Sequence, residues 1–260
     1  MTALASLPAL THSLDRTLVI EAPREVVFRF FTDEKRWAAW WGEGSTINPT
    51  PGGALLIRYP GGTEVVGEVL AVDSPDRIVF TYGYASGQMI PPGGSLVTIR
   101  LEAHSRGTKL QFKHEFAEAG TRDMHVQGWR YQLSLFSNVV ANELHANAAV
   151  AVDEWFGAWL EEDGGARLQR LAAIAVPGLR FRDRFSLIDG IDEMNEQIGA
   201  AQRFMPGLRM ERRGDVRHCQ GTVLAEWVAL TKDGEERGRG TNVYALGPDG
   251  KIESVVGFWQ

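Results

Sequence analysis

The stretch SLVTIRLEAHSRGTKLQFKHEF, residues 95–116, decides the fold class of the first half of this chain. Apolar and polar side chains alternate along it, with Val97, Ile99 and Leu101 on one face, and Ser105-Arg106-Gly107 interrupts the alternation. A period of two is typical of a strand with one buried face, and a short glycine-containing break between two such strands predicts a hairpin. The stretch therefore predicts two antiparallel strands of a half-buried sheet.

The residues on either side extend this sheet and add helices to it. Further strands are predicted at 13–22, 54–59, 63–72 and 77–84, between turn signals rich in Pro and Gly. Helical spacing of apolar residues predicts a short helix after Pro23, a second one that ends at Gly42, and a long one over 122–146. The first half is therefore predicted to be an α+β domain, residues 12–146, with a curved antiparallel sheet facing a long helix.

The pattern resets near residue 147 and predicts a second α+β domain, residues 147–260. It begins with two helices and continues with a strand, a third helix and a run of strands. The predicted helices are 148–162, 166–175 and 190–204, and the predicted strands are 179–185, 208–219, 222–231, 238–247 and 251–259.

Composition narrows the classes of function. The chain has 260 residues and a net charge of -6, and Lys and Arg form no basic stripe, so nucleic acid is not an expected partner. Its apolar runs are too short to span a membrane. The single cysteine, Cys219, excludes an internal disulfide and suits a reducing cytoplasm. The histidines lack the spacing of metal ligands and no phosphate-binding loop is present, so neither a metal nor a cofactor is expected.

The first half resembles the START-like superfamily and, within it, the group named after the activator of the heat-shock-protein-90 ATPase. The resemblance implies a helix-grip fold with a cavity between sheet and helix, and a small-ligand-binding or stress-linked role. The segments that carry it are 20–28 (IEAPREVVF), 40–42 (WWG), 51–53 (PGG), 67–69 (GEV), 74–81 (SPDRIVFT), 97–99 (VTI), 107–114 (GTKLQFKH) and 128–129 (GW).

The second half resembles the SnoaL-like, nuclear-transport-factor-2-like domains, the family of polyketide cyclases and ketosteroid isomerases. The resemblance implies a cone-shaped α+β barrel around a pocket and, by analogy of fold, a homodimer through this domain. The segments that carry it are the helix pair at 148–175, then 177–183 (PGLRFRD), 190–194 (GIDEM), 204–207 (FMPG), 240–243 (GTNV), 250–252 (GKI) and 255–259 (VVGFW).

Asp183 is the strongest candidate for chemistry. On the predicted strand 179–185 it shares a face with Phe181 and Phe185. A carboxylate among aromatic side chains is costly to ionise, so its pKa is expected to rise towards that of a general base. The resemblance places Asp183 at the position of the base in steroid isomerases. The alternative is a structural aspartate that is hydrogen-bonded to backbone or paired with an arginine.

The rest of the isomerase site departs from this sequence. The resemblance aligns the acid that donates to the developing oxyanion with Asn242, and the tyrosine of the first helix with Trp155. Steroid-isomerase chemistry is therefore not expected, although Asn242 can still donate a hydrogen bond to a carbonyl. His218 and Trp227 are expected on the inner faces of their strands and so in the same cavity, with a satisfied or surface histidine as the alternative.

Aromatic residues also gather on the predicted inner side of the first domain. An aromatic lining with few polar groups suits an apolar, ring-bearing ligand, and an ordinary core is the alternative. The candidate lining residues are Trp40, Trp41, Phe80, Tyr82, Tyr84, Met89, Phe112, His114 and Trp129.

Three functions follow from these residues and resemblances. The favoured one is binding of a small apolar or aromatic ligand in one or both domain cavities. The second is a cyclase-, isomerase- or hydratase-type enzyme with Asp183 as general base and Asn242 as carbonyl donor. The third is a chaperone-linked stress protein.

Overall fold

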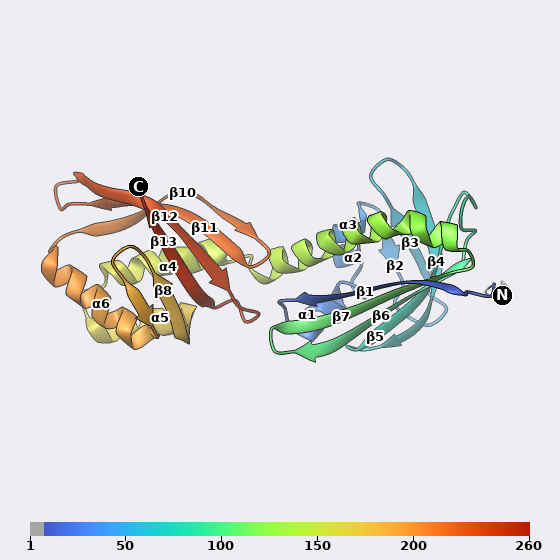
Figure 1. Cartoon of the computed structure of the whole chain (residues 1–260), viewed down its shortest axis with the longest axis horizontal. Coiled ribbons are helices and arrows are strands. Elements are labelled where there is room, and N and C mark those ends of the chain that lie inside the picture. Colours follow the sequence, from blue (N-terminus) through green and yellow to red (C-terminus); the bar gives the residue numbers. More distant parts are fainter. Residues whose placement is uncertain (1–7) are drawn as a thin grey trace. The chain divides into compact units, whose positions relative to one another are not determined.

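The computed structural model describes residues 8–260 and divides the chain into two compact units (Figure 1). The first unit ends at Val140, and the second spans Ala141–Gln260. Each unit combines one mainly antiparallel sheet with helices, so the α+β fold class predicted from the sequence is confirmed.

The sheet of the first unit has seven strands in the order β1-β7-β6-β5-β4-β3-β2, and every neighbouring pair is antiparallel. Its strands are β1 His12–Ile20, β2 Thr46–Ile47, β3 Ala54–Arg58, β4 Glu64–Asp73, β5 Arg77–Tyr84, β6 Ser95–His104 and β7 Gly107–Phe116. The predicted hairpin is β6 and β7, in which Val97 pairs with His114 and Ile99 with Phe112 on the buried face.

Three helices accompany this sheet: α1 Arg24–Arg29, α2 Glu34–Trp41 and α3 Ala119–Leu144. The Asp33 side chain caps α2 by accepting from the backbone N–H of Arg36 at 3.0 Å. Gly42 ends the helix at φ 140°, where a Cβ would lie 2.2 Å from the carbonyl oxygen of Arg58, so only glycine fits. Trp129 of α3 packs on Phe112 of the sheet, with ring centroids 4.1 Å apart.

The sheet of the second unit has six strands in the order β10-β11-β12-β13-β8-β9. The β13–β8 pair is parallel and the other pairs are antiparallel. The strands are β8 Ala175–Arg182, β9 Leu187–Asp189, β10 Arg209–Cys219, β11 Thr222–Leu230, β12 Glu236–Leu246 and β13 Ile252–Trp259.

Three helices, α4 Ala148–Leu160, α5 Gly164–Ile174 and α6 Ile191–Phe204, lie together beside this sheet (Figure 1). Trp155 of α4, Leu171 of α5 and Met194 of α6 are fully buried in the core that the helices share with the inner face of the sheet. Asp163 caps α5 by accepting from the backbone N–H of Ala166 at 2.7 Å. The open end of this core forms the candidate site.

One predicted strand is shifted. Residues 179–185 were predicted as one strand, but β8 ends at Arg182 and Asp183 lies in the bend before β9. The reason is a tight turn, in which the backbone N–H of Asp183 donates to the carbonyl of Ser186 at 3.1 Å and that of Ser186 donates back at 3.4 Å. The chain reverses there, and β9 pairs antiparallel with β8.

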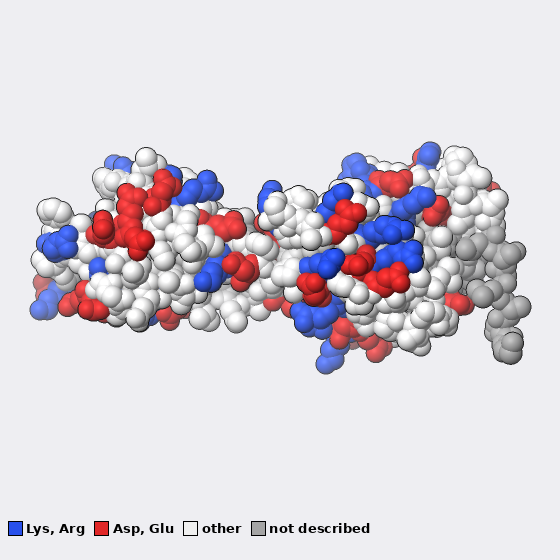
Figure 2. Space-filling view, turned by 90° about the horizontal axis from the view of Figure 1, so that it is seen from below, with Lys and Arg blue, Asp and Glu red and all other residues white. Residues whose placement is uncertain are grey.

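Charges of both signs are interspersed on the face of the molecule seen in Figure 2. Many are paired on the outer surface of the first sheet, including Glu102 with Lys109 at 3.1 Å and Glu115 with Lys113 at 2.7 Å. Such exposed pairs add little stability, but they leave no single-sign patch on this face. Within residues 8–260, no helix is long and apolar enough to cross a membrane.

Candidate functional site

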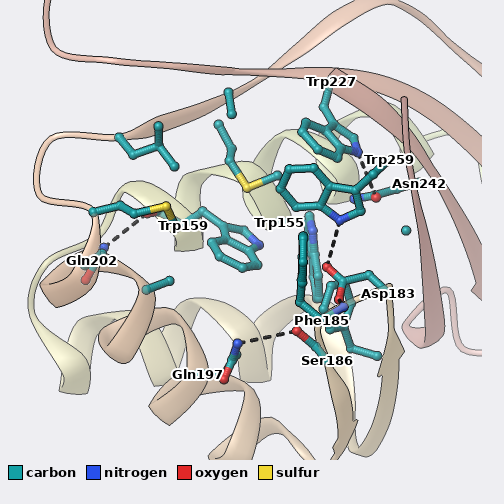
Figure 3. Close-up of a pocket in the computed structure, with 17 residues that line it drawn as sticks. Trp155, Trp159, Asp183, Phe185, Ser186, Gln197, Gln202, Trp227, Asn242 and Trp259 are labelled. Atoms are coloured by element: carbon teal, nitrogen blue, oxygen red, sulfur yellow. Dashed lines mark hydrogen bonds between the residues drawn. The ribbon is translucent and has the colours of Figure 1, made fainter. Parts of the chain in front are cut away.

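A cavity of about 410 Å³ opens in the second unit between the inner face of the sheet and helices α4 and α6 (Figure 3). Its lining is dominated by aromatic side chains, with a few polar groups among them. The aromatic residues are Trp155, Trp159, Phe181, Phe185, Trp227 and Trp259, and the polar ones are Asp183, Ser186, Gln197, Gln202 and Asn242.

Asp183 holds its carboxylate at the wall of this cavity through two hydrogen bonds. The backbone N–H of Phe185 donates to Oδ1 at 2.8 Å, and the indole Nε1 of Trp259 donates to Oδ2 at 3.1 Å (Figure 3). Both donors are neutral, and no cationic side chain of residues 8–260 forms an ion pair with this carboxylate. Of the structural roles weighed for Asp183, backbone hydrogen bonding is present and arginine pairing is not.

Asn242 is fixed by its neighbours in one orientation. The indole Nε1 of Trp227 lies 3.0 Å from its Oδ1, and an indole nitrogen can only donate, so the amide oxygen faces Trp227. The amide Nδ2 then donates to the hydroxyl of Tyr244 at 3.2 Å. Burial raises the pKa of Tyr244, so this hydroxyl stays protonated.

Gly257 separates Asp183 from Asn242. It pairs with Asn242 across the β12–β13 ladder and follows Val256, which pairs with Arg182 on β8. A Cβ at position 257 would lie 3.2 Å from both the Asn242 Oδ1 and the Asp183 Cβ. Glycine here therefore leaves a gap between a carboxylate and an amide that face the same cavity.

Two further tryptophans on the wall were not anticipated from the sequence. Trp259 shares the inner face of β13 with Val255 and Gly257, and Trp159 lies one helical turn after Trp155 on α4. Trp259 could have been found from the period of two along 251–259, and Trp159 from its spacing of four residues after Trp155 on α4. The ring centroids of Trp227 and Trp259 are 4.8 Å apart at an interplanar angle of 81°.

The four tryptophans differ in their hydrogen bonding. Trp227 and Trp259 donate to Asn242 and Asp183, whereas the indole nitrogens of Trp155 and Trp159 are covered by surrounding atoms and have no acceptor within residues 8–260. A buried donor without a partner costs about 1–3 kcal/mol. Two donors on the wall are therefore unsatisfied.

The structure places five of the six residues expected in this cavity together: Trp155, Phe181, Asp183, Trp227 and Asn242. His218 is the exception, and its expected place in the cavity is wrong. It pairs with Val223 on the inner face, four residues along β11 from Trp227, which is roughly 13 Å along a strand. There its Nδ1 donates to the Asn142 Oδ1 at 3.2 Å while its Nε2 accepts from the backbone N–H of Gly221 at 3.0 Å.

His114 of the first unit is satisfied on both sides. Ser95 Oγ donates to the carbonyl of Tyr82 at 2.8 Å, so this hydroxyl accepts from His114 Nε2, also at 2.8 Å. His114 Nδ1 accepts from the indole Nε1 of Trp129 at 2.8 Å. Burial, and secondarily the neighbouring His125, keeps the pKa of His114 well below its ordinary value. His114 is a neutral core histidine in this arrangement.

The other aromatic residues expected around a first-domain pocket pack on one another. Trp40, Trp41, Phe80, Tyr82, Phe112 and Trp129 are all buried, with neighbouring ring centroids 4.1–6.2 Å apart. For Trp40 and Trp41 the alternative weighed for the lining residues, an ordinary core, is therefore what the structure shows. Tyr84 is half-buried, with its hydroxyl 3.0 Å from His125 Nε2, and Met89 is exposed in a turn at φ 62°.

No group of three or more His, Cys, Asp or Glu among the described residues is arranged to hold a metal ion. In the cavity, the arrangement offers one carboxylate that can accept a proton or attract a cation, neutral amide side chains, and aromatic walls.

Residues 21–141 match the family model described as Activator of Hsp90 ATPase homolog 1-like protein, which confirms the first resemblance. No functionally curated protein matches the chain.

Two solved structures are each similar to part of the chain. A SnoaL-like family protein from Agrobacterium tumefaciens is 25% identical over 45% of this chain and 98% of its own, with a TM-score of 0.42. The Aha1 dimer from Colwellia psychrerythraea is 17% identical over 47% of this chain and 91% of its own, also with a TM-score of 0.42.

Proposed function

We propose that the second unit binds a small, largely apolar, ring-bearing molecule in its cavity. The observation that carries the proposal is a cavity of about 410 Å³ walled by four tryptophans and two phenylalanines. That volume lies in the range of small-molecule sites, which are mostly apolar with a few placed polar groups. The helix-grip and cone-shaped arrangements inferred for the two domains are both fold types built around such a pocket.

The proposal concerns the second unit because the aromatic residues of the first unit are engaged with one another. His114 has partners on both ring nitrogens, and the rings around it fill the space between sheet and helix. In the second unit, the aromatic residues instead border an open volume.

A cavity-blocking variant tests the proposal. Ala201 of α6 lines the cavity, so Ala201→Phe fills it, whereas Ala149 of α4 is exposed and Ala149→Phe is the matched control. A thermal-shift screen with ring-bearing molecules, neutral and charged, is run on all three proteins. A ligand at about 100 times its Kd adds roughly 2.7 kcal/mol to the native state, so binders raise the midpoint.

We expect binders to raise the midpoint of the natural protein and of Ala149→Phe but not that of Ala201→Phe. Binders that raise the midpoint of Ala201→Phe equally would place their site elsewhere and refute the proposal.

The position of Asp183 favours a second candidate, proton-transfer chemistry on a ring ketone. The Asp183 carboxylate faces the cavity and could take a proton from the carbon next to a bound carbonyl. Asn242 presents its Oδ1 to the gap at Gly257, so it could donate to that carbonyl only if its amide turned over and gave up its hydrogen bonds with Trp227 and Tyr244. The test is turnover of cyclic ketones by the natural protein, Asp183→Asn and Asn242→Ala. Turnover that survives Asp183→Asn would remove the base role.

We also infer a homodimer through the second unit. Val256 and Phe258 alternate with the cavity-lining Gly257 and Trp259 on β13, so they lie on the opposite face of the sheet, where they are 37% and 57% exposed. Sedimentation of the natural protein beside Phe258→Ser tests this, and we expect the variant to sediment as a monomer. A natural protein that is monomeric at micromolar concentration would contradict the inference.

A further inference from the structure

The cavity of the second unit carries one charge, and it is negative. Among the described residues that line it, Asp183 is the single ionisable side chain, and Ser186, Gln197, Gln202 and Asn242 are the neutral polar ones. The groups that hold the carboxylate, a backbone N–H and an indole N–H, orient it without neutralising it.

The arginines next to Asp183 along the chain are engaged elsewhere. Arg182 donates to the carbonyl of Ile188 at 2.5 Å and to Asp189 at 3.0 Å. The guanidinium carbon of Arg184 lies 5.0 Å from the centroid of the Phe185 ring. Neither side chain lines the cavity, so no cationic side chain of the lining compensates the charge of Asp183.

Filling the cavity changes the surroundings of this carboxylate. Asp183 is half-buried, and a ligand that displaces water from it removes part of its hydration. A neutral apolar ligand supplies nothing in return, which makes the removal of water unfavourable. A ligand with a positive charge compensates for the lost hydration by direct attraction.

The aromatic walls favour the same kind of ligand. Four indoles and two phenyl rings border the cavity, and Trp259 both lines it and donates to Asp183 (Figure 3). Aromatic rings attract cations through their negative faces, tryptophan most strongly, and an aromatic cage is how proteins recognise quaternary ammonium groups.

We propose that the ligand of this cavity is a monovalent organic cation, an apolar ring-bearing molecule whose protonated or quaternary amine lies against Asp183. This specifies the ligand class of the binding function proposed above and rests on it. The amine is held by one carboxylate and the neighbouring indoles, and the rest of the molecule fills the remaining cavity between the aromatic walls.

Three probes of nearly the same shape test the proposal on the full chain: benzyltrimethylammonium, its neutral carbon isostere neopentylbenzene, and the anion benzylsulfonate. Equilibrium dialysis at fixed ionic strength gives a Kd for each. We expect the cation to bind at least about tenfold more tightly than the neutral isostere, and the anion not to bind.

Variants then assign the preference to one side chain. Asp183→Asn removes the charge with little change of shape, and we expect it to abolish the preference for the cation without weakening the binding of neopentylbenzene, because an amide costs less to desolvate than a carboxylate. Asp189→Asn is the matched control, because it removes the same charge from an exposed carboxylate outside the cavity, and it should preserve the preference.

The outcomes separate the two proposals. Equal affinity of the natural protein for the cation and the neutral isostere overturns the cation proposal and leaves the binding function standing, whether or not Asp183→Asn folds. Loss of the preference in Asp189→Asn as well overturns the assignment to Asp183. A natural protein that binds none of the three probes contradicts both the cation proposal and the binding function.

Discussion

Two tryptophans on the cavity wall donate hydrogen bonds and two do not, although all four line the same space. Comparing the two kinds of tryptophan therefore separates the contribution of ring burial to stability from the contribution of the hydrogen bond. The Trp227 indole satisfies Asn242 Oδ1, which is buried, whereas the Trp155 indole is buried with an unsatisfied donor.

Replacing each of these two tryptophans with phenylalanine removes the same volume but has different polar consequences. Trp227→Phe leaves the Asn242 oxygen buried without a partner, which costs about 1–3 kcal/mol beyond the lost packing. Trp155→Phe removes a donor that has no partner, so this additional cost is absent. We therefore expect the free energy of unfolding of Trp227→Phe to lie about 1–3 kcal/mol below that of Trp155→Phe in urea titrations. Equal stabilities would show that the Trp227–Asn242 hydrogen bond contributes nothing net.

At the scale of helices and strands, side-chain period and turn residues allowed most elements to be predicted. The hairpin over 95–116 is an example, because apolar positions alternate there without interruption and glycine marks the turn. The shortest strands, β2 and β9, were missed because two or three residues are too few to show a period. The strand predicted at 179–185 begins earlier, at Ala175, and ends earlier, at Arg182, where the turn between Asp183 and Ser186 reverses the chain.

A residue of the candidate site could be predicted from the sequence only where knowing which face of its strand it lies on was sufficient to place it in the cavity. Asn242 and Trp227 follow from alternation, but His218 shows that the correct face can still be the wrong end of a strand. In the first unit, Trp40 and His114 had the composition of a pocket wall and are core, because spacing does not reveal whether facing side chains meet or leave a gap.

In strand β12, Gly240 has no side chain and so leaves space for the ring of Trp227. A Cβ at Gly240 would lie 2.1 Å from the carbonyl oxygen of Phe258 and 2.6 Å from Cζ2 of Trp227, and neither the backbone nor a buried indole can move away cheaply. We expect Gly240→Ala to lower the free energy of unfolding of the second unit by about 1–3 kcal/mol, as overpacking does. Gly178→Ala, where nothing lies within 4 Å of an added Cβ, should change it by less than about 0.5 kcal/mol. Chemical denaturation of both variants measures the difference, and similar losses in the two would refute the steric explanation.

At the scale of the whole molecule, both units contain buried or half-buried histidines whose pKa is lowered by burial. Burial lowers the pKa of His114 and His125 in the first unit and of His145 and His218 in the second. A histidine that stays neutral in the folded chain but titrates normally in the unfolded chain makes the unfolded state bind more protons at low pH. Both units should therefore lose stability on acidification before their carboxylates begin to titrate.

For His114, the direction and the size of this loss of stability on acidification can be stated. Its unfolded pKa is about 6.5 and its folded pKa is well below its ordinary value, so its contribution is unchanged above pH 7.5 and is lost as pH falls below about 6.5. Protonation of Nδ1 would also remove the acceptor of the Trp129 N–H.

We expect the free energy of unfolding of the first unit to fall by up to about 1.4 kcal/mol per pH unit through this residue, measured by urea titration at pH 7.5, 6.5 and 5.5. His114→Gln should reduce that slope by up to about 1.4 kcal/mol per pH unit, with His125 supplying part of the remainder. Stability that is flat or rising between pH 6.5 and 5.5 in the natural protein would mean that His114 is charged in the folded state, which its acceptor role towards Trp129 does not permit.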